Sequence, residues 1–187
     1  MDSYIYKPRV MVFAGPNGSG KTTVTRSIPI VGTYVNADDM KKTYDLTDIE
    51  AAKLAESLRN KLLNGGMSFS FETVMSTERN LKLIKKAKER GYEVKCIYVL
   101  TCNENINVAR VKARYAAGGH DVPEDKIRLR YHRALKLLPR VMEVCDEILI
   151  YDNTVMPSLL ASKDNDVLEI FPNIFWSESD LRALLEA

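Results

Sequence analysis

The chain has 187 residues, of which 45% are hydrophobic and 28% are charged. This length and composition are typical of one soluble globular domain, here 1–187, whose core needs no disulfide bonds. The net charge of +2 does not by itself indicate a nucleic-acid-binding protein, so nucleic acid is not expected as a partner.

Short apolar runs alternate with helical periodicity through most of the chain. Residues 9–14 predict a buried first strand, followed by a glycine-rich turn and a helix from 21 to about 28. Further strands are expected at 33–35, 68–71, 94–100 and, as the last strand of the sheet, 147–151. Further helices are expected from the capping box at 47–50 to residue 63, and over about 81–90, 104–117 and 123–138. This alternation predicts the three-layer α/β fold of P-loop NTPases, a mostly parallel sheet flanked by helices.

The C-terminal part of the sequence has a different pattern. Residues 159–162 and 167–171 flank Lys163-Asp164-Asn165-Asp166, which predicts a hairpin, and a final helix is expected over about 178–185. We expect this segment, about 154–187, to be an appendage because it is too short for a domain.

The three cysteines, Cys96, Cys102 and Cys145, are odd in number and lack the spacing of metal ligands. Free thiols in a reducing compartment are therefore expected. The N-terminus MDSYIYKPRV contains no apolar signal region, and no apolar run approaches the length that spans a membrane. We therefore expect a cytoplasmic protein with no membrane partner.

The segment from Gly15 to Thr22 matches the pattern G-x-x-x-x-G-K-[ST] in full, between an expected strand and an expected helix. Its glycines allow positive φ and leave room for phosphate oxygens, so backbone N–H groups can face the anion. Lys21 is expected to reach the β- and γ-phosphates, and the Thr22 hydroxyl is expected to bind Mg²⁺. The sequence therefore predicts a site for ATP with Mg²⁺. The residues expected to hold the nucleotide are Gly15, Pro16, Asn17, Gly18, Ser19, Gly20, Lys21, Thr22, Thr23 and Asn153.

The same loop serves kinases, motor ATPases and switch GTPases. The guanine-reading N-K-x-D of GTPases is absent, and the run 94–100 ends in Thr101-Cys102 instead of the Asp usual in motor ATPases. These absences and the short chain favour a small-molecule kinase.

A kinase of this kind needs a carboxylate that positions the acceptor hydroxyl and takes its proton. Asp38 and Asp39 follow the expected strand 33–35, so both should lie at the carboxyl edge of the sheet, where ligands bind in open α/β sheets. We favour Asp38 as the general base and Asp39 as a substrate-binding residue. The alternative for both is capping of a helix over 40–44.

Glu72 directly follows the apolar run 69–71, so it should point into the cleft, with Thr73 beside it. Glu72 could bind substrate hydroxyls or hold Mg²⁺ through water. A surface Glu is the alternative.

Two basic helices are expected to form a lid over about 104–138, in a segment where nine Lys and Arg oppose three acids between 105 and 140. Arg110 and Arg114 lie one helical turn apart, and Arg130 shares a face of the next helix with Arg133. We assign Arg110 and Arg114 to catalysis and Arg130 to substrate binding, because arginines on a lid would neutralise charge on the transferred phosphoryl group. Ordinary exposed salt bridges are the alternative.

Gly118-Gly119 lies between these helices and is the expected hinge of the lid. His120, which follows, is assigned to substrate binding, with a plain turn residue as the alternative. A zinc-binding role is disfavoured because no Cys or His partner is suitably spaced.

Several motifs then occur in order: AGPNGSGKTT, NADD, FETVMS, RVKARYAAGGHDVPEDKIRLRYHR and YDN. Together, over about 10–153, they resemble the zeta-toxin-like kinases, in particular the branch that carries G-G-H-D-V-P. The resemblance implies ATP-dependent phosphorylation of a hydroxyl of UDP-N-acetylglucosamine, and an antitoxin protein as partner. It matches Asp38 to the family's catalytic base, Glu72 to its substrate-binding Glu and Arg110 to its first lid arginine.

The chain departs from the family pattern at three motifs. The family's D-x-D-[ST]-F stands here as Asn36-Ala37-Asp38-Asp39-Met40, and its E-G-T stands as Glu72-Thr73-Val74. His120 stands where the second lid arginine is expected, with Arg114, Arg128 and Arg130 as substitutes. Kinases of another acceptor (an antibiotic, a sugar or a nucleic-acid end) and an ATP-sensing interaction protein remain the alternatives.

Overall fold

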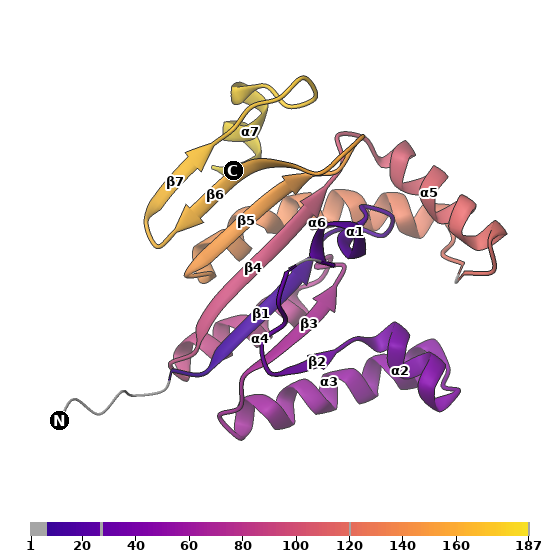
Figure 1. The fold of residues 1–187 in the computed structure, drawn as a ribbon, viewed down its shortest axis with the longest axis vertical. Coiled ribbons are helices and arrows are strands. Elements are labelled where there is room, and N and C mark those ends of the chain that lie inside the picture. The colour runs from indigo at the N-terminus through magenta and orange to yellow at the C-terminus, as the bar shows by residue number, and fades with distance from the viewer. Residues whose placement is uncertain (1–6, 27, 120, 187) are drawn as a thin grey trace.

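One seven-stranded sheet forms the centre of the protein, for which the computed structural model describes residues 7–26, 28–119 and 121–186 (Figure 1). From neighbour to neighbour, the strands are β2 (Thr33–Val35), β3 (Phe69–Thr73), β1 (Arg9–Ala14), β4 (Glu93–Leu100), β5 (Glu147–Asp152), β6 (Ser158–Asp164) and β7 (Val167–Ile170). The strand pairs from β2 to β5 are parallel, whereas β5–β6 and β6–β7 are antiparallel. The predicted α/β fold with a mostly parallel sheet is confirmed.

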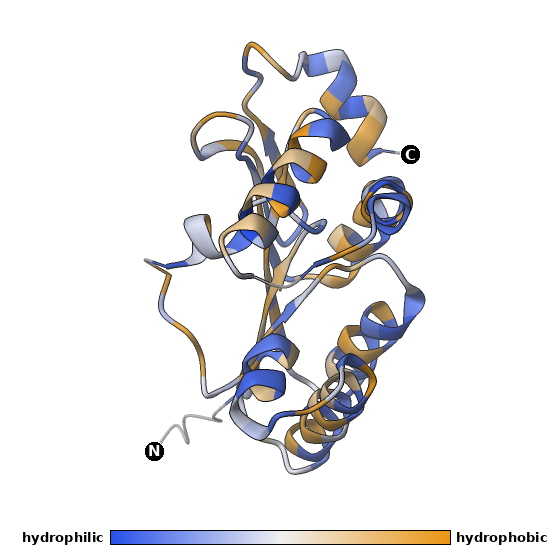
Figure 2. Cartoon of the chain, turned by 90° about the vertical axis from the view of Figure 1, so that its right-hand side faces the viewer, coloured by the Kyte–Doolittle hydropathy of each residue, from blue (hydrophilic) through white to orange (hydrophobic). Residues whose placement is uncertain are grey.

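Helices cover both faces of this sheet. Val24 of α1 (Lys21–Thr25) packs with Phe13, Ile97 and Val99 on one face. The larger core includes buried side chains from four helices, α3 (Asp48–Asn64), α4 (Glu78–Glu89), α6 (Glu124–Val144) and α7 (Glu178–Leu185). Two more helices, α2 (Ala37–Tyr44) and α5 (Glu104–Ala116), extend past the carboxyl ends of the strands (Figure 1). In the edge-on view of Figure 2, hydrophobic and hydrophilic residues occupy different sides of the helices.

β1 occupies the position at which the chain order reverses. It lies between β3 and β4, and the last five residues of β4, CIYVL, are all buried. Such β-branched and aromatic runs suit a strand that is covered on both faces. Ligands bind in open α/β sheets at this switch point, outside the carboxyl ends of the strands, so a site is expected beyond β1.

β6 and β7 form the predicted hairpin, but they extend the central sheet. β6 pairs with β5, Leu160 and Ala161 of β6 are fully buried, and Leu181 of α7 lies in the main core. The expectation that 147–151 is the last strand of the sheet is therefore wrong, and the hairpin is no separate appendage. Its pairing covers the edge of β5, which would otherwise expose unpaired backbone groups.

Two boundaries near the site differ from those predicted. α1 ends at Thr25 rather than near 28. Pro29 disfavours the helical conformation for Ile28, the residue before it, and so excludes the predicted end. β3 continues through Glu72 and Thr73, which remain paired with β1. Glu72 is therefore held by the sheet itself rather than by a loop after the strand.

α6 continues through Pro139 to Val144, although the sequence predicted an end at 138. A proline inside a helix costs about 3 kcal/mol. Val141 and Met142 beyond it are buried, and each such side chain contributes about 1.5–3 kcal/mol. Packing therefore outweighs the local signal. Within the described ranges no helix, α6 included, combines the length and apolarity needed to cross a membrane.

Candidate functional site

The phosphate loop connects β1 to α1 at the carboxyl edge of the sheet. Gly18 and Gly20 have φ values of 76° and 82°, in the left-handed region. A Cβ at Gly18 would collide with the backbone carbonyl of Asn107, and a Cβ at Gly20 would collide with the side-chain amide of Asn153. Both positions therefore require glycine for conformation and for space.

Lys21 is the charged side chain at the centre of this loop. It is buried, and its Nζ donates hydrogen bonds to the carbonyl oxygens of Gly15 at 2.9 Å and Pro16 at 3.2 Å. The same Nζ lies 3.7 Å from Oε1 of Glu72. Thr22 and Thr23, the other expected nucleotide ligands of α1, have exposed side chains. The loop thus combines a buried ammonium group with accessible hydroxyls.

The electrostatics of Lys21 show which predicted residues lie around it. Burial lowers the pKa of Lys21, the negative charges of Glu72 and Asp38 oppose this effect, and the positive charge of Arg114 adds to it. All three side chains therefore lie near enough to act on the ammonium group. The structure brings together four residues that are spread over 94 positions of the sequence, from 21 to 114.

Asp38 lies in the first turn of α2. The helix is capped by Asn36, whose Oδ1 accepts a hydrogen bond from the backbone N–H of Asp38 at 2.8 Å. The carboxylates of Asp38 and Asp39 are therefore not needed for the cap, which answers the alternative considered for them. Both carboxylates also lie at the helix end where negative charge is favoured.

Glu72 is half-buried and takes part in a short polar chain. Its Oε2 accepts a hydrogen bond from the Tyr34 hydroxyl at 3.4 Å, and the Asn36 amide donates to the same hydroxyl at 3.3 Å. Burial is the main cause of a raised pKa at Tyr34, so its hydroxyl keeps its proton and can donate. Glu72 is thus positioned from two sides, by Tyr34 and by Lys21.

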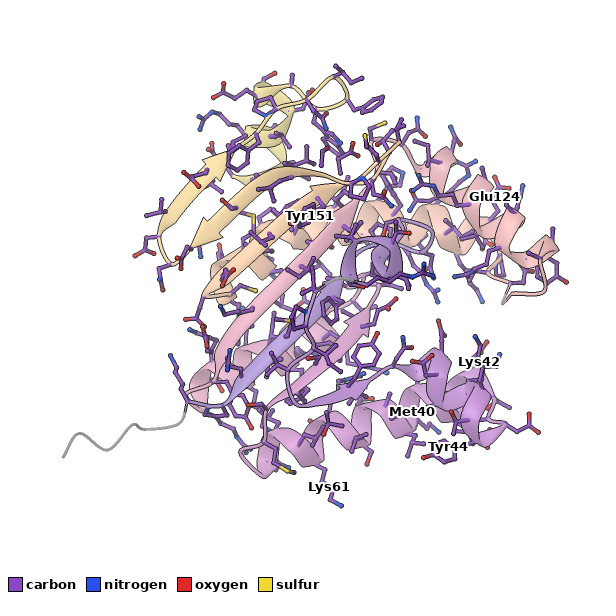
Figure 3. The ribbon with its side chains drawn as sticks, in the orientation of Figure 1. Met40, Lys42, Tyr44, Lys61, Glu124 and Tyr151 are labelled. Carbon is purple, nitrogen blue, oxygen red and sulfur yellow. The ribbon has the colours of Figure 1, made fainter. Side chains whose placement is uncertain are left out.

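One cleft joins these residues. It has a volume of about 740 Å³ and lies between α2 and α3 on one side and α5 with α6 on the other (Figure 3). The predicted site residues that line it are Asn17, Gly18, Lys21, Asp38, Glu72, Thr73, Arg114 and Arg130. Asp39 is exposed and does not line it. Ligand pockets typically measure about 300–1,000 Å³, so the cleft suits a small-molecule substrate.

The basic helices contribute unequally to the cleft. Arg114 of α5 and Arg130 of α6 both line it, and Arg130 donates a hydrogen bond to Oδ1 of Asn17 in the phosphate loop at 3.2 Å. Arg128 instead pairs with Glu104 and Glu124, as expected for an ordinary salt-bridge residue.

Arg110, assigned to catalysis from the sequence, lies outside this lining. Its guanidinium donates to the backbone carbonyls of Asn153 at 2.8 Å and Thr154 at 3.0 Å. The Asn153 side chain donates in turn to the carbonyl of Ser19 at 2.8 Å. Arg110 therefore holds the loop after β5, and Asn153 of that loop holds the phosphate loop.

Asn107 is a part of the site that the sequence analysis missed. It is fully buried, accepts a hydrogen bond from the Thr101 hydroxyl and donates from Nδ2 to the carbonyl of Asn17 at 2.7 Å. The available signal was a polar residue on the apolar face of a helix, since the buried residues of α5 are Asn107, Val108 and Val111. Asn107 ties α5 directly to the phosphate loop.

Gly118 and Gly119 end α5. Gly118 has a φ of 84°, its N–H bonds to the carbonyl of Tyr115, and the N–H of Gly119 bonds to the carbonyl of Arg114. This is the Schellman arrangement, which alone accounts for a glycine at 118. His120 lies outside the described residues.

Comparison with known proteins places the chain in a family. The family model for Zeta toxin matches residues 26–165, well over half of the chain. An uncharacterized protein of Haemophilus influenzae is 29% identical over 134 residues, which cover 68% of this chain and 96% of that protein.

Solved structures share the fold. A chain of the AvrRxo1-ORF1:AvrRxo1-ORF2 complex with ATP superposes with a TM-score of 0.71 at 15% identity, covering 88% of this chain but only 60% of that chain. A chain of the PezAT toxin–antitoxin system of Streptococcus pneumoniae superposes with a TM-score of 0.65 at 18% identity, covering 98% of this chain and 85% of that chain. With the family match and the intact phosphate loop, the chain belongs to the zeta toxin family of ATP-binding P-loop kinases.

Proposed function

We propose that this protein transfers the γ-phosphate of ATP to a hydroxyl group of a small acceptor, with a sugar nucleotide such as UDP-N-acetylglucosamine as the first candidate. The observation that carries the proposal is the meeting of Lys21 with Asp38 and Glu72 in one cleft. Triphosphate binding alone needs a cation and backbone amides, whereas carboxylates facing that cation suit an acceptor hydroxyl.

Each residue then has a distinct role. The phosphate loop and Lys21 hold the triphosphate, and Glu72 binds an acceptor hydroxyl while fixing Lys21. Asp38 takes the hydroxyl proton as the acceptor oxygen forms its bond to the γ-phosphorus and the bond to the β-phosphate oxygen breaks, releasing ADP. Arg114 and Arg130 neutralise charge on the transferred group.

The residues present fit Mg²⁺ held jointly with a triphosphate. The described ranges contain no group of three or more His, Cys, Asp or Glu side chains that could hold a metal ion by themselves. Mg²⁺ usually keeps several waters and binds through substrate phosphates with one or two protein oxygens. The exposed hydroxyl of Thr22 and, through water, Glu72 would supply those oxygens. When bound, the ion would neutralise charge between the β- and γ-phosphates.

We propose that residues 1–187 act as one domain and that a protein of antitoxin type is a partner. The hairpin and α7 share the main core with α3 and α4, which supports a single domain. Family membership supports the partner. The PezAT system is a toxin–antitoxin pair by name.

A panel of acceptors tests the proposed reaction. The protein is incubated with ATP labelled at the γ-phosphate and with a sugar nucleotide, a free sugar, an aminoglycoside or a 5′-hydroxyl oligonucleotide. We expect steady-state transfer of label to a hydroxyl of the sugar nucleotide. If only another compound of the panel is phosphorylated, that compound replaces the sugar nucleotide as the proposed acceptor. Stoichiometric ATP binding without phosphorylation of any compound would favour the ATP-sensing alternative.

We further propose that α5 and the first half of α6 act as a lid. Val108 and Val111 of α5 form a small hydrophobic cluster with Val122 and Ile127, separate from the two clusters of the sheet. A unit with its own small core can move without breaking the main one. Asn107 and Arg130 connect it to the phosphate loop at Asn17.

Hydrogen exchange tests the lid. A non-hydrolysable ATP analogue with Mg²⁺ is expected to slow amide exchange in peptides from α5 and the first half of α6, because bound phosphates would order the arginines facing them. Peptides from β4 and β5 serve as the internal control and should not change. Equal protection of the lid peptides with and without the analogue would contradict the proposal.

A further inference from the structure

A second cavity, of about 240 Å³, lies between α3 and α4 and adjoins the cleft. We call it the α3–α4 pocket. Its walls are Glu56, Arg59, Asn60, Arg79, Asn80, Lys82, Leu83 and Lys86. Arg59, Arg79 and Asn80 also line the cleft, so the two spaces share a wall. The assigned roles of the phosphate loop, Asp38 and Glu72 do not use this pocket.

Arg59 is the unusual residue of the shared wall. It is only 7% exposed, and its guanidinium lies over the Phe71 ring, 5.1 Å from the centroid. Among the described residues its buried Nε has no hydrogen-bond partner. A buried guanidinium without a carboxylate is costly, and such groups are normally paired. Packing on Phe71 accounts for the position of the side chain, but an apolar residue could pack there as well. The packing therefore does not explain why the residue is an arginine.

The charges around Arg59 favour an anion. Four cationic residues and a single acid, Glu56, line the pocket. Glu56 lies 3.4 Å from Arg79 rather than against Arg59. Burial is the main cause of a lowered pKa at Arg59; the charge of Glu56 opposes the shift and that of Arg79 adds to it. The amides of Asn60 and Asn80 add neutral donors to the same walls.

The pocket also adjoins the strand that carries Glu72, β3. Phe71, under the guanidinium, directly precedes Glu72 in the strand. Asn80 donates from Nδ2 to the hydroxyl of Thr73 at 2.6 Å, on the other side of Glu72. Successive side chains of a strand point to opposite faces, but Arg59 and Glu72 both line the cleft, so a ligand group held at Arg59 would share that cleft with Glu72.

We propose that the α3–α4 pocket is an anion-binding site that holds the phosphate group of a phosphorylated acceptor, with Arg59 as its buried anchor. Arginine presents a planar set of donors that matches phosphate oxygens, and a second arginine and two lysines line the same walls. Arg59 is then a specificity-determining residue that binds the phosphate group of the acceptor. It is distinct from the residues that act on the acceptor hydroxyl. The expected effect on turnover rests on the proposed kinase function. The expected binding of phosphate in the pocket does not depend on that function.

The test uses Arg59→Met, which removes the charge while keeping an unbranched side chain over Phe71. Replacement of a buried unpaired charge by an apolar side chain is compatible with folding. Lys61→Met is the matched control, because Lys61 is an exposed cation of the same helix that points away from the cleft (Figure 3). Thermal unfolding confirms that both variants are folded.

Binding of inorganic pyrophosphate is measured by calorimetry with the phosphate loop saturated by a non-hydrolysable ATP analogue. Wild type and Lys61→Met should bind it equally, and Arg59→Met should bind it about 10- to 100-fold more weakly, the usual effect of losing charge-assisted hydrogen bonds. This readout requires no turnover, so it stands even if no acceptor is phosphorylated. Equal binding by wild type and Arg59→Met would overturn the proposal.

Turnover measurements then show whether the pocket binds the phosphate of the acceptor or binds phosphate independently of the acceptor. N-acetylglucosamine 1-phosphate and N-acetylglucosamine are compared as acceptors, with pyrophosphate as inhibitor. We expect Arg59→Met to raise KM for the phosphorylated acceptor about 10- to 100-fold, with little change in kcat and no change for the free sugar. Pyrophosphate should inhibit competitively against the phosphorylated acceptor. Non-competitive inhibition, or an equal KM for both acceptors in wild type, would overturn the assignment of the pocket to the acceptor.

Discussion

Replacing Lys21 by alanine is expected to reduce phosphoryl transfer severely while leaving the fold intact. Lys21 is the buried cation of the phosphate loop, and Glu72 holds its ammonium group at 3.7 Å. In the proposed site Lys21 contacts the β- and γ-phosphates, so its removal would weaken their binding in both the ground state and the transition state. Loss of one such preorganised group costs roughly 10²–10³-fold in rate. Binding of ATP should also weaken, since a charge-assisted contact is lost.

The experiment compares Lys21→Ala with Lys42→Ala by calorimetry with ATP and Mg²⁺ and by steady-state transfer. Lys42 is an exposed lysine of α2 that does not line the cleft, so its variant should match wild type. Circular dichroism confirms the fold of both. Unchanged ATP affinity and turnover in Lys21→Ala would refute the assignment of the phosphate loop.

Asp38→Asn is expected to reduce transfer by roughly 10²-fold or more, the usual contribution of a general base. ATP binding should remain nearly intact, because Asp38→Asn leaves Gly15–Thr22, the proposed triphosphate site, unchanged. The structure adds a reason to favour Asp38 over Asp39. Asp38 lines the cleft and acts electrostatically on Lys21, whereas Asp39 does not line the cleft. Successive residues of a helix point about 100° apart, so the two carboxylates face different directions.

Asp39→Asn is therefore the matched control, with the same change of charge at the neighbouring position. ATP affinity and acceptor phosphorylation are measured for both variants over a range of acceptor concentrations. Loss of transfer in Asp39→Asn alone would move the base by one residue. Full activity in both variants would show that neither Asp38 nor Asp39 is the general base.

Local sequence was sufficient for the parts of the protein that depend on neighbours in the chain. The phosphate loop is a contiguous motif whose glycines are required by the backbone itself, so its position between β1 and α1 was predicted. The core strands were also predicted, because apolar runs such as CIYVL in β4 indicate a buried strand by their composition alone. Placing Asp38 and Glu72 at one edge needed only the rule that parallel strands end together.

Long-range packing decided the rest. The hairpin was predicted, but its pairing with β5 depends on an edge that no local pattern reveals. Arg110 and Arg114 are equivalent by spacing, yet only Arg114 lines the cleft, because Arg110 meets the carbonyls of Asn153 and Thr154. Asn107 and Arg59 look like ordinary polar residues of amphipathic helices. Their roles follow from burial against Asn17 and Phe71, contacts that bridge 90 and 12 residues of the chain and exist only once the helices have packed on the sheet.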